Sequence, residues 1–208
     1  MNEKRIFALV PVKALAKGKS RLSPVMNPAV RIRFNTFLMN RTFDLVSRFP
    51  GVSRSIVISD CDVVQAEARA RDLKALKEDS NDLNAALASA TRRAMSLGAE
   101  AVIVLPVDLP MASSTDLEHI AALDDGSGPC CMIVSDTHSS GTNLLYVSPP
   151  RDDIYRFGPA SRERHGLAAL ERNFKVIHVD NDALALDIDD PRDFERWREA
   201  GGSFCANR

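Results

Sequence analysis

Residues 6–22 read IFALVPVKALAKGKSRL. The apolar run at the start of this stretch ends at Lys13, and three more cations follow at Lys17, Lys19 and Arg21. Short, continuous apolar runs are typical of strands that are covered on both faces of a sheet. The stretch therefore predicts a buried first strand, followed by a loop that gathers positive charge.

Short apolar runs recur along the chain and alternate with segments of helical spacing. The predicted strands lie at residues 6–12, 54–59, 101–105, 131–134, 143–147 and 176–179. The predicted helices lie at residues 28–49, 63–72, 81–97, 161–173 and 191–200. This alternation indicates an α/β fold, a three-layer α/β/α sandwich around a mainly parallel sheet. We expect residues 1–208 to form a single domain, because the length suits one compact unit.

The overall composition limits the classes of partner. The formal net charge is -1, whereas a dedicated nucleic-acid binder usually carries a basic surplus, so we expect no nucleic-acid partner. No apolar run approaches the roughly 18 residues of a membrane span, and the N-terminus lacks the apolar stretch of a signal peptide. The 4 cysteines have no metal-binding spacing and are interpreted as reduced thiols. We therefore expect a cytoplasmic protein without membrane contact.

The cations after the first strand require a local anion, because the chain as a whole is nearly neutral. Backbone N–H groups in a loop, together with cations, form sites for phosphate groups. The alternative is a basic loop that is merely solvated. In open α/β sheets, ligands bind beyond the carboxyl ends of the strands. The residues that follow each strand are therefore the candidates for chemistry.

Carboxylates follow two other predicted strands. Asp108 lies in the motif LPVDLP, and Asp187 and Asp189 stand two residues apart in LDIDDP. In an extended chain such a pair points to one side, where two carboxylates repel unless a cation lies between them. Mg²⁺ is bound through carboxylates and substrate phosphate oxygens, so we predict that these three residues hold Mg²⁺. The alternatives are a turn residue for Asp108 and a polar loop for the pair.

A pocket for a second anion is predicted near the start of helix 161–173. Thr142 precedes a predicted strand, and Gly158 and Ser161 flank the start of the helix. Backbone N–H groups at a helix start bind anions, and the two hydroxyls add donors. His165 lies one turn into this helix, and we expect it to face the same pocket; the alternative is an ordinary packed histidine.

Taken together, these groups indicate a phosphoryl or nucleotidyl transfer site. Cations follow the first strand, one carboxylate follows a central strand, and paired carboxylates follow a late strand. Metal ions and cations neutralise phosphate charge in such sites, and catalysis is mostly a matter of positioning. No GxSxG or HExxH motif supports a hydrolase.

With these motifs in place, the sequence resembles the nucleotidyltransferases of GT-A-like fold, which is the nucleotide-diphospho-sugar-transferase-like fold. More closely, it resembles the family of 2-phospho-L-lactate and phosphoenolpyruvate guanylyltransferases. The resemblance spans nearly the whole chain and rests on VPVKALAKGKSRL, DLNAAL, LPVDLP, SGTNLL, RFGPAS with His165, and LDIDDP. It implies transfer of GMP from GTP to 2-phospho-L-lactate, phosphoenolpyruvate or 3-phosphoglycerate, with release of pyrophosphate, in the biosynthesis of the deazaflavin coenzyme F-420.

The resemblance also implies a role for each matching residue. The GTP triphosphate would be held by Lys13, Lys17, Lys19 and Arg21, and Asn84 would lie near the base and ribose. The residues of the chemical step would be Lys19, Arg21 and Asp108. Two Mg²⁺ ions would be bound by Asp108, Asp187 and Asp189. The acceptor would be held by Thr142, Gly158, Ser161 and His165. The phosphate of the acceptor is already ionised at neutral pH, so its attack on the α-phosphate would need no general base.

Three positions depart from the usual pattern of the family. Val107 and Ala160 stand where a smaller residue and a glycine are usual, and Asp82 replaces the glycine of GLN. The acceptor therefore stays open among these phospho-acids. Alternatives are a nucleotidyltransferase for a phosphonate, a sugar phosphate or a molybdopterin-type acceptor, and a catalytically silent nucleotide-binding protein. A downstream transferase that consumes the product, and a second copy of the chain in a homodimer, are partners that the sequence leaves open.

Overall fold

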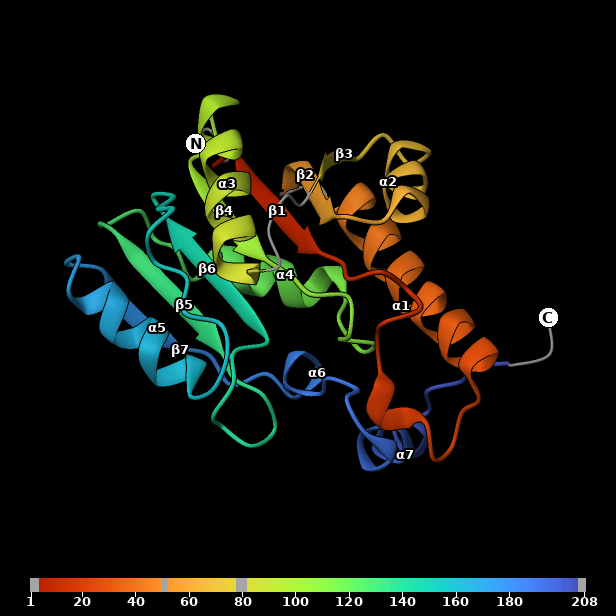
Figure 1. Ribbon diagram of the computed structural model, residues 1–208. Coiled ribbons are helices and arrows are strands. Elements are labelled where there is room, and N and C mark those ends of the chain that lie inside the picture. Colours follow the sequence, from red (N-terminus) through yellow and green to blue (C-terminus); the bar gives the residue numbers. More distant parts are fainter. Residues whose placement is uncertain (1–3, 50–51, 78–81, 206–208) are drawn as a thin grey trace.

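The sheet determines where the site lies. The computed structural model describes residues 4–49, 52–77 and 82–205, and within these ranges seven strands form one sheet of order β3-β2-β1-β4-β6-β5-β7 (Figure 1). The strands are β1 (Ile6–Pro11), β2 (Val52–Ser59), β3 (Lys74–Lys77), β4 (Ala101–Val104), β5 (Cys130–Val134), β6 (Leu144–Ser148) and β7 (Lys175–His178). Strand β6 is antiparallel to β4 and β5, and the other pairings are parallel. The expected mainly parallel sheet is confirmed.

Helices cover both faces of this sheet. They are α1 (Pro28–Arg48), α2 (Asp62–Arg69), α3 (Leu83–Ser96), α4 (Ser114–Ala122), α5 (Ser161–Leu170), α6 (Asp182–Ala185) and α7 (Pro191–Glu199), with the 3₁₀ turn η1 (Ser20–Leu22). One apolar cluster joins the sheet to α1, α2 and α4, and another joins it to α3 and α5. Figure 1 shows α3 and α5 in front of the sheet and α4 behind it. The expected three-layer sandwich is confirmed. None of the helices described is long and apolar enough to cross a membrane.

Strand β1 contains no polar residue because both of its faces are covered. Ala8 and Val10 belong to the cluster on the α1 side, whereas Phe7 and Leu9 belong to the cluster on the α3 side. Successive side chains of a strand point to opposite faces, so a strand covered on both faces must be apolar at every residue. Each fully buried Phe or Leu contributes about 1.5–3 kcal/mol of transfer free energy.

Besides the 3₁₀ turn η1, strand β3 and helices α4 and α6 were not predicted from the sequence. Strand β3 has only four residues, KALK, which is too short to show a periodic pattern. Helix α4 begins at a capping box formed by Ser113 and Asp116, a signal that the sequence did contain. The predicted helix 81–97 begins at Leu83, because the Asp82 side chain accepts a hydrogen bond from the Asn84 N–H and caps it. Residue 81 lies outside the described residues.

A third apolar cluster fixes the C-terminal segment against the loop that follows β1. Ile188 and Leu22 are fully buried and belong to one cluster with Phe34 of α1 and Trp197 of α7. Figure 1 shows the segment after β1, in red, running down toward α7. Because Ile188 separates two carboxylates and Leu22 follows the cationic loop, burial of these two residues brings the charged groups to one place.

Candidate active site

A cleft of about 540 Å³ opens beyond the carboxyl ends of β1 and β4. All four predicted cations line it: Lys13, Lys17, Lys19 and Arg21. Asp108 and Asp189 line it as well, and so does Val107, which is one of the departures from the family pattern. The structure therefore brings the predicted nucleotide-binding cations together with two of the predicted metal ligands.

Asn35 of α1 holds the cationic loop in place. Its Nδ2 donates a hydrogen bond of 2.7 Å to the carbonyl oxygen of Leu15. Gly18 lies so near that a Cβ at this position would meet the same Nδ2 at 2.8 Å, so this close approach requires glycine. Asn35 is buried and lines the cleft, and our sequence analysis missed it. The signal was slight: one polar residue among the apolar positions of a long helix.

Lys19 joins two carboxylates. Its Nζ lies 2.9 Å from Asp108 Oδ2 and 3.0 Å from Asp189 Oδ1, and its side chain is only 9% exposed. Burial lowers the pKa of Lys19, but the two carboxylates raise it by more, so the net shift is upward and the side chain stays charged. Arg21 Nη1 lies 3.7 Å from Asp189 Oδ2, and its side chain is 76% exposed. Arg21 is thus free to reach a phosphate in the cleft.

The three predicted metal ligands form one cluster. One carboxylate oxygen from each of Asp108, Asp187 and Asp189 lies within 4.8 Å of the others. The Ile188 N–H donates to the Asp108 carbonyl oxygen at 3.1 Å, which ties the two segments together. Burial, aided by the charge of Asp108, raises the pKa of Asp187 to about 6. An oxygen-only donor set with surplus negative charge fits a hard divalent cation.

Asn143 orients Asp187, and our sequence analysis did not include it among the site residues. Its Nδ2 lies 3.2 Å from Asp187 Oδ1, and it also donates to the carbonyl oxygens of Leu184 and Ala185 at 3.1 and 2.9 Å. Asn143 precedes β6, which runs antiparallel to β4. The reversed direction of β6 places its first residues at the carboxyl edge of the other strands, so the position of Asn143 depends on a pairing that the local sequence does not show.

The predicted acceptor residues lie on two adjoining segments. The Arg162 N–H donates to the Ser140 carbonyl oxygen at 3.2 Å, which joins the loop before β6 to the start of α5. Gly158 has φ 126° and Ala160 has φ 54°, so the turn before α5 passes through two positive-φ residues. Thr142 and Ser161 are both buried, at 8% and 2% exposure. Their contact with an acceptor stays a prediction.

His165 lies behind this turn. The ring is fully buried, and the Arg156 N–H donates to its Nε2 at 2.8 Å. Nε2 therefore accepts and the ring proton is on Nδ1, which faces Thr142 Oγ1 at 3.0 Å. Burial, with added repulsion from Arg156 and Arg164, lowers the pKa of His165 to about 3. Both ring nitrogens thus face groups of the protein, and the contact of His165 with an acceptor stays a prediction.

Asn84 uses its amide within the protein. Its Nδ2 donates to the Phe157 carbonyl oxygen at 3.1 Å, and the Phe157 N–H donates to its Oδ1 at 2.7 Å. The preceding residue, Leu83, lines the cleft. The amide is thus paired with the turn before α5, while Leu83 of α3 lines the cleft. The implied contact of Asn84 with the base and ribose stays a prediction.

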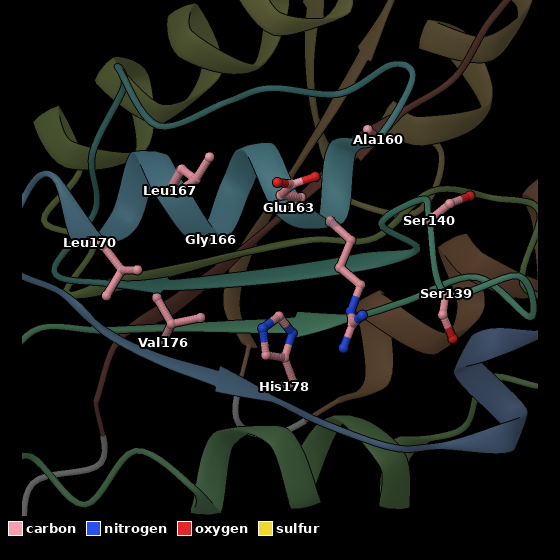
Figure 2. Close-up of a pocket in the computed structure, with 10 residues that line it drawn as sticks. Ser139, Ser140, Ala160, Glu163, Gly166, Leu167, Leu170, Val176 and His178 are labelled. Atoms are coloured by element: carbon pink, nitrogen blue, oxygen red, sulfur yellow. The ribbon is translucent and has the colours of Figure 1, made fainter.

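A second groove lies between α5 and the strand β7 (Figure 2). Its volume is about 680 Å³, and Leu167, Leu170 and Val176 give it apolar walls. It shares no lining residue with the cleft, and Glu163 is the one carboxylate among its lining residues. Although this groove is larger, it does not gather the cations and carboxylates that a nucleotide and a metal require. We therefore assign the candidate active site to the cleft.

Comparison with solved structures shows the same fold. A protein from Desulfovibrio desulfuricans G20, described as a nucleotide-diphospho-sugar transferase, has a TM-score of 0.77 at 16% identity, over 96% of this chain and 89% of that chain. A nucleotidyl transferase from Methanothermobacter thermautotrophicus has a TM-score of 0.65 at 16% identity, over 94% and 97% of the two chains. These likenesses concern the fold alone.

Sequence comparison adds the family. A phosphoenolpyruvate guanylyltransferase from Rubrobacter xylanophilus is 38% identical over 199 residues, which is 95% of either chain. A 2-phospho-L-lactate guanylyltransferase from Methanothermobacter thermautotrophicus is 30% identical over 190 residues, 89% of this chain and 81% of the relative. The family described as "Guanylyl transferase CofC like" matches residues 6–197. The chain therefore belongs to this guanylyltransferase family and is a nucleotidyltransferase.

Proposed function

We propose that this protein transfers GMP from GTP to the phosphate of a small phospho-acid and releases pyrophosphate. The main support is the contact of Lys19 with Asp108 and Asp189 inside a cleft that further cations line. Relatives named as phosphoenolpyruvate and 2-phospho-L-lactate guanylyltransferases support the choice of substrates. Phosphoenolpyruvate is the first acceptor to test, and 2-phospho-L-lactate and 3-phosphoglycerate are the next.

The reaction is an in-line displacement at the α-phosphorus of GTP. An oxygen of the acceptor phosphate forms the new P–O bond, and the bond between the α-phosphorus and the bridging oxygen breaks. The electron pair leaves with pyrophosphate. The acceptor oxygen is already ionised at neutral pH, so no side chain has to remove a proton. This agrees with the neutral, buried state of His165.

The side chains of the cleft supply charge and position. Lys19 and Arg21 face the phosphates, where they stabilise the negative charge of the departing pyrophosphate. Asp108, Asp187 and Asp189 would hold Mg²⁺, with Asn143 orienting Asp187. When bound, Mg²⁺ neutralises phosphate oxygens and aligns them. Lys13 and Lys17, which are exposed on the cleft wall, add attraction for the triphosphate.

The test is a grid of nucleotides and acceptors. Pyrophosphate release is measured with Mg²⁺ for GTP, ATP and CTP, each combined with phosphoenolpyruvate, 2-phospho-L-lactate and 3-phosphoglycerate. We expect release with GTP and at least one acid. Release with another nucleotide would correct the donor, while GTP binding without release for every acid would reject the proposed reaction with these acceptors.

A further inference from the structure

The segment between β6 and α5 is held in place by side chains. Among the described residues, no backbone–backbone hydrogen bond outside regular elements involves residues 149–159. The segment nevertheless contains buried residues, among them Ile154 and Tyr155. A buried loop must satisfy its backbone polar groups in some other way. Side chains of α3 and α5, the two helices that cover this face of the sheet, bind some of these groups, and the Arg156 guanidinium donates to the carbonyl oxygens of Asp153 and Tyr155.

Helix α3 holds alternate residues of the segment. The amide of Asn84 pairs with both backbone groups of Phe157, and the Thr91 hydroxyl hydrogen-bonds to the Tyr155 hydroxyl. Asn84 and Thr91 are seven residues apart, which is about two helical turns, so they lie on one face of α3. Tyr155 and Phe157 are two residues apart, so in an extended chain they face the same side.

Helix α5 holds the residue between them. The Arg156 N–H points to His165 Nε2, opposite in direction to the Phe157 N–H that points to Asn84. Consecutive N–H groups that point in opposite directions are the mark of an extended chain. The Phe157 ring also packs edge-on against His165, with ring centroids 4.6 Å apart. Residues 155–157 are thus fixed from two sides, directly before Gly158 and the start of α5.

We propose that Asn84 and His165 are positioning residues for the acceptor, which fix segment 155–157 and thereby the turn at Gly158. Leu83, the residue before Asn84, lines the cleft, whereas the Asn84 amide itself is directed to the turn. The inference rests on the proposed function, in which the start of α5 receives the acceptor. It assigns Asn84 to the acceptor side of the reaction and not to the base or ribose of the nucleotide.

The decisive variant is Asn84→Ala. The loss of two hydrogen bonds to the Phe157 backbone should raise KM for the phospho-acid about tenfold and change KM for GTP by less than about twofold. A direct contact with the base or ribose predicts the reverse, with the larger change in KM for GTP. A rise in KM for GTP as large as that for the acid, or no change in either, would overturn the inference.

Two further variants separate positioning from general stability. Arg92→Ala is the matched control, because Arg92 lies on the same helix and pairs with Asp152 of the same segment through exposed side chains. It should leave both KM values unchanged, since such surface pairs contribute little. His165→Gln keeps a polar side chain at the second anchor and should likewise raise KM for the acid more than KM for GTP. Equal changes in the two KM values would reject the role of His165.

A readout without turnover distinguishes this inference from the proposed function. If wild-type protein is inactive with each acid, the proposed function fails, while the support of the segment is still measurable by hydrogen exchange. Asn84→Ala should speed amide exchange in residues 152–158 about tenfold, and Arg92→Ala should not. Unchanged exchange in Asn84→Ala would show that the amide does not hold the segment, and the inference would be rejected.

Discussion

Two lysines stand at opposite edges of the same sheet, one on either side of β1. Lys4 lies before the strand and contacts Asp124, whose carboxylate also accepts a 2.7 Å hydrogen bond from the Tyr146 hydroxyl. Lys19 lies after the strand and contacts Asp108 and Asp189. Both pairs are partly buried, yet the pKa of Asp124 lies below its ordinary value, whereas the pKa of Asp187, a neighbour of the Lys19 pair, lies above it.

At the amino edge, the negative charge of Asp124 is balanced by the positive charge of Lys4. Burial opposes ionisation of Asp124, but its hydrogen bonds with Lys4, Tyr146 and Ser148 together lower the pKa to about 2. At the carboxyl edge, the buried Lys19 contacts Asp108 and Asp189, and burial together with repulsion from these two carboxylates raises the pKa of Asp187 to about 6. The Lys4–Asp124 network, in which the charges balance, therefore stabilises the fold. The cluster of three aspartates carries surplus negative charge and is suited to bind a ligand with positive charge.

The backbone conformation also differs between the two edges. At the ends of α2 and α5, left-handed conformations are taken by Asp72 and Asn173, residue types that tolerate them. At the carboxyl edge, Lys19 and Ala160 adopt φ 56° and 54°, which neither side chain favours. Strain is therefore concentrated at the edge that carries the candidate site, as is common for functional sites.

The largest effect is expected from removing one carboxylate at the carboxyl edge. Asp108→Asn or Asp189→Asn should lower the turnover on the order of 10³-fold, because the charge that holds the metal is lost. The free energy of unfolding should change by no more than about 1 kcal/mol, since the substitution also relieves repulsion within the cluster. Pyrophosphate release and urea unfolding measure the two quantities. A large loss of stability with intact turnover would show that the carboxylates at the carboxyl edge serve the fold, like Asp124 at the amino edge.

The opposite outcome is expected at the amino edge. Asp124→Asn should lower the free energy of unfolding by about 2–3 kcal/mol, because it breaks a largely buried pair, and should leave turnover unchanged. Asp125→Asn is the matched control, since Asp125 is an exposed neighbour, and it should leave the free energy of unfolding nearly unchanged. Loss of turnover in correctly folded Asp124→Asn would show that the amino edge also serves the reaction.

His165 adds a third case to the comparison, because it lies near the carboxyl edge and both of its ring nitrogens have hydrogen-bond partners within the protein. Its pKa is about 3 in the folded protein, against an ordinary value of 6.5. The unfolded chain therefore binds a proton more readily, so stability is complete above pH 6.5 and is lost as the pH falls toward 3. At pH 5 the loss due to His165 should be about 2 kcal/mol. Urea unfolding at pH 7 and pH 5 measures the free energy of unfolding of wild-type protein and of His165→Gln. The decrease between the two pH values should be smaller by this amount in His165→Gln, and an equal decrease in both proteins would contradict the prediction.

The smallest effect concerns the strained backbone. Ala160→Gly should raise the free energy of unfolding by about 0.5–1 kcal/mol, because release of the left-handed strain exceeds the added entropy of the unfolded chain. Asn173→Gly is the control, since asparagine already tolerates this conformation and little gain is expected. Thermal unfolding of the two variants gives the comparison. A stability loss in Ala160→Gly would mean that the alanine methyl group makes contacts that outweigh its strain.

Much of the site was predictable because the motifs follow strands. In parallel strands the carboxyl ends meet at one edge, so a cation after β1 and a carboxylate after β4 must be neighbours. The hydrogen-bond partners of His165 could not be predicted in this way. A histidine one turn into a helix can face either the ligand or the core, and helical spacing alone does not distinguish these sides.

By itself, the sequence determined the α/β architecture and the grouping of cations and carboxylates, because apolar runs and the residues after them are local properties. Only the tertiary structure decided the partners of individual polar groups. Asn143 reached Asp187 through the antiparallel direction of β6, and Asn84 reached Phe157 across 73 positions of sequence. Hydrogen bonds of this kind depend on distances between segments that are remote in the chain, and no local pattern records those distances.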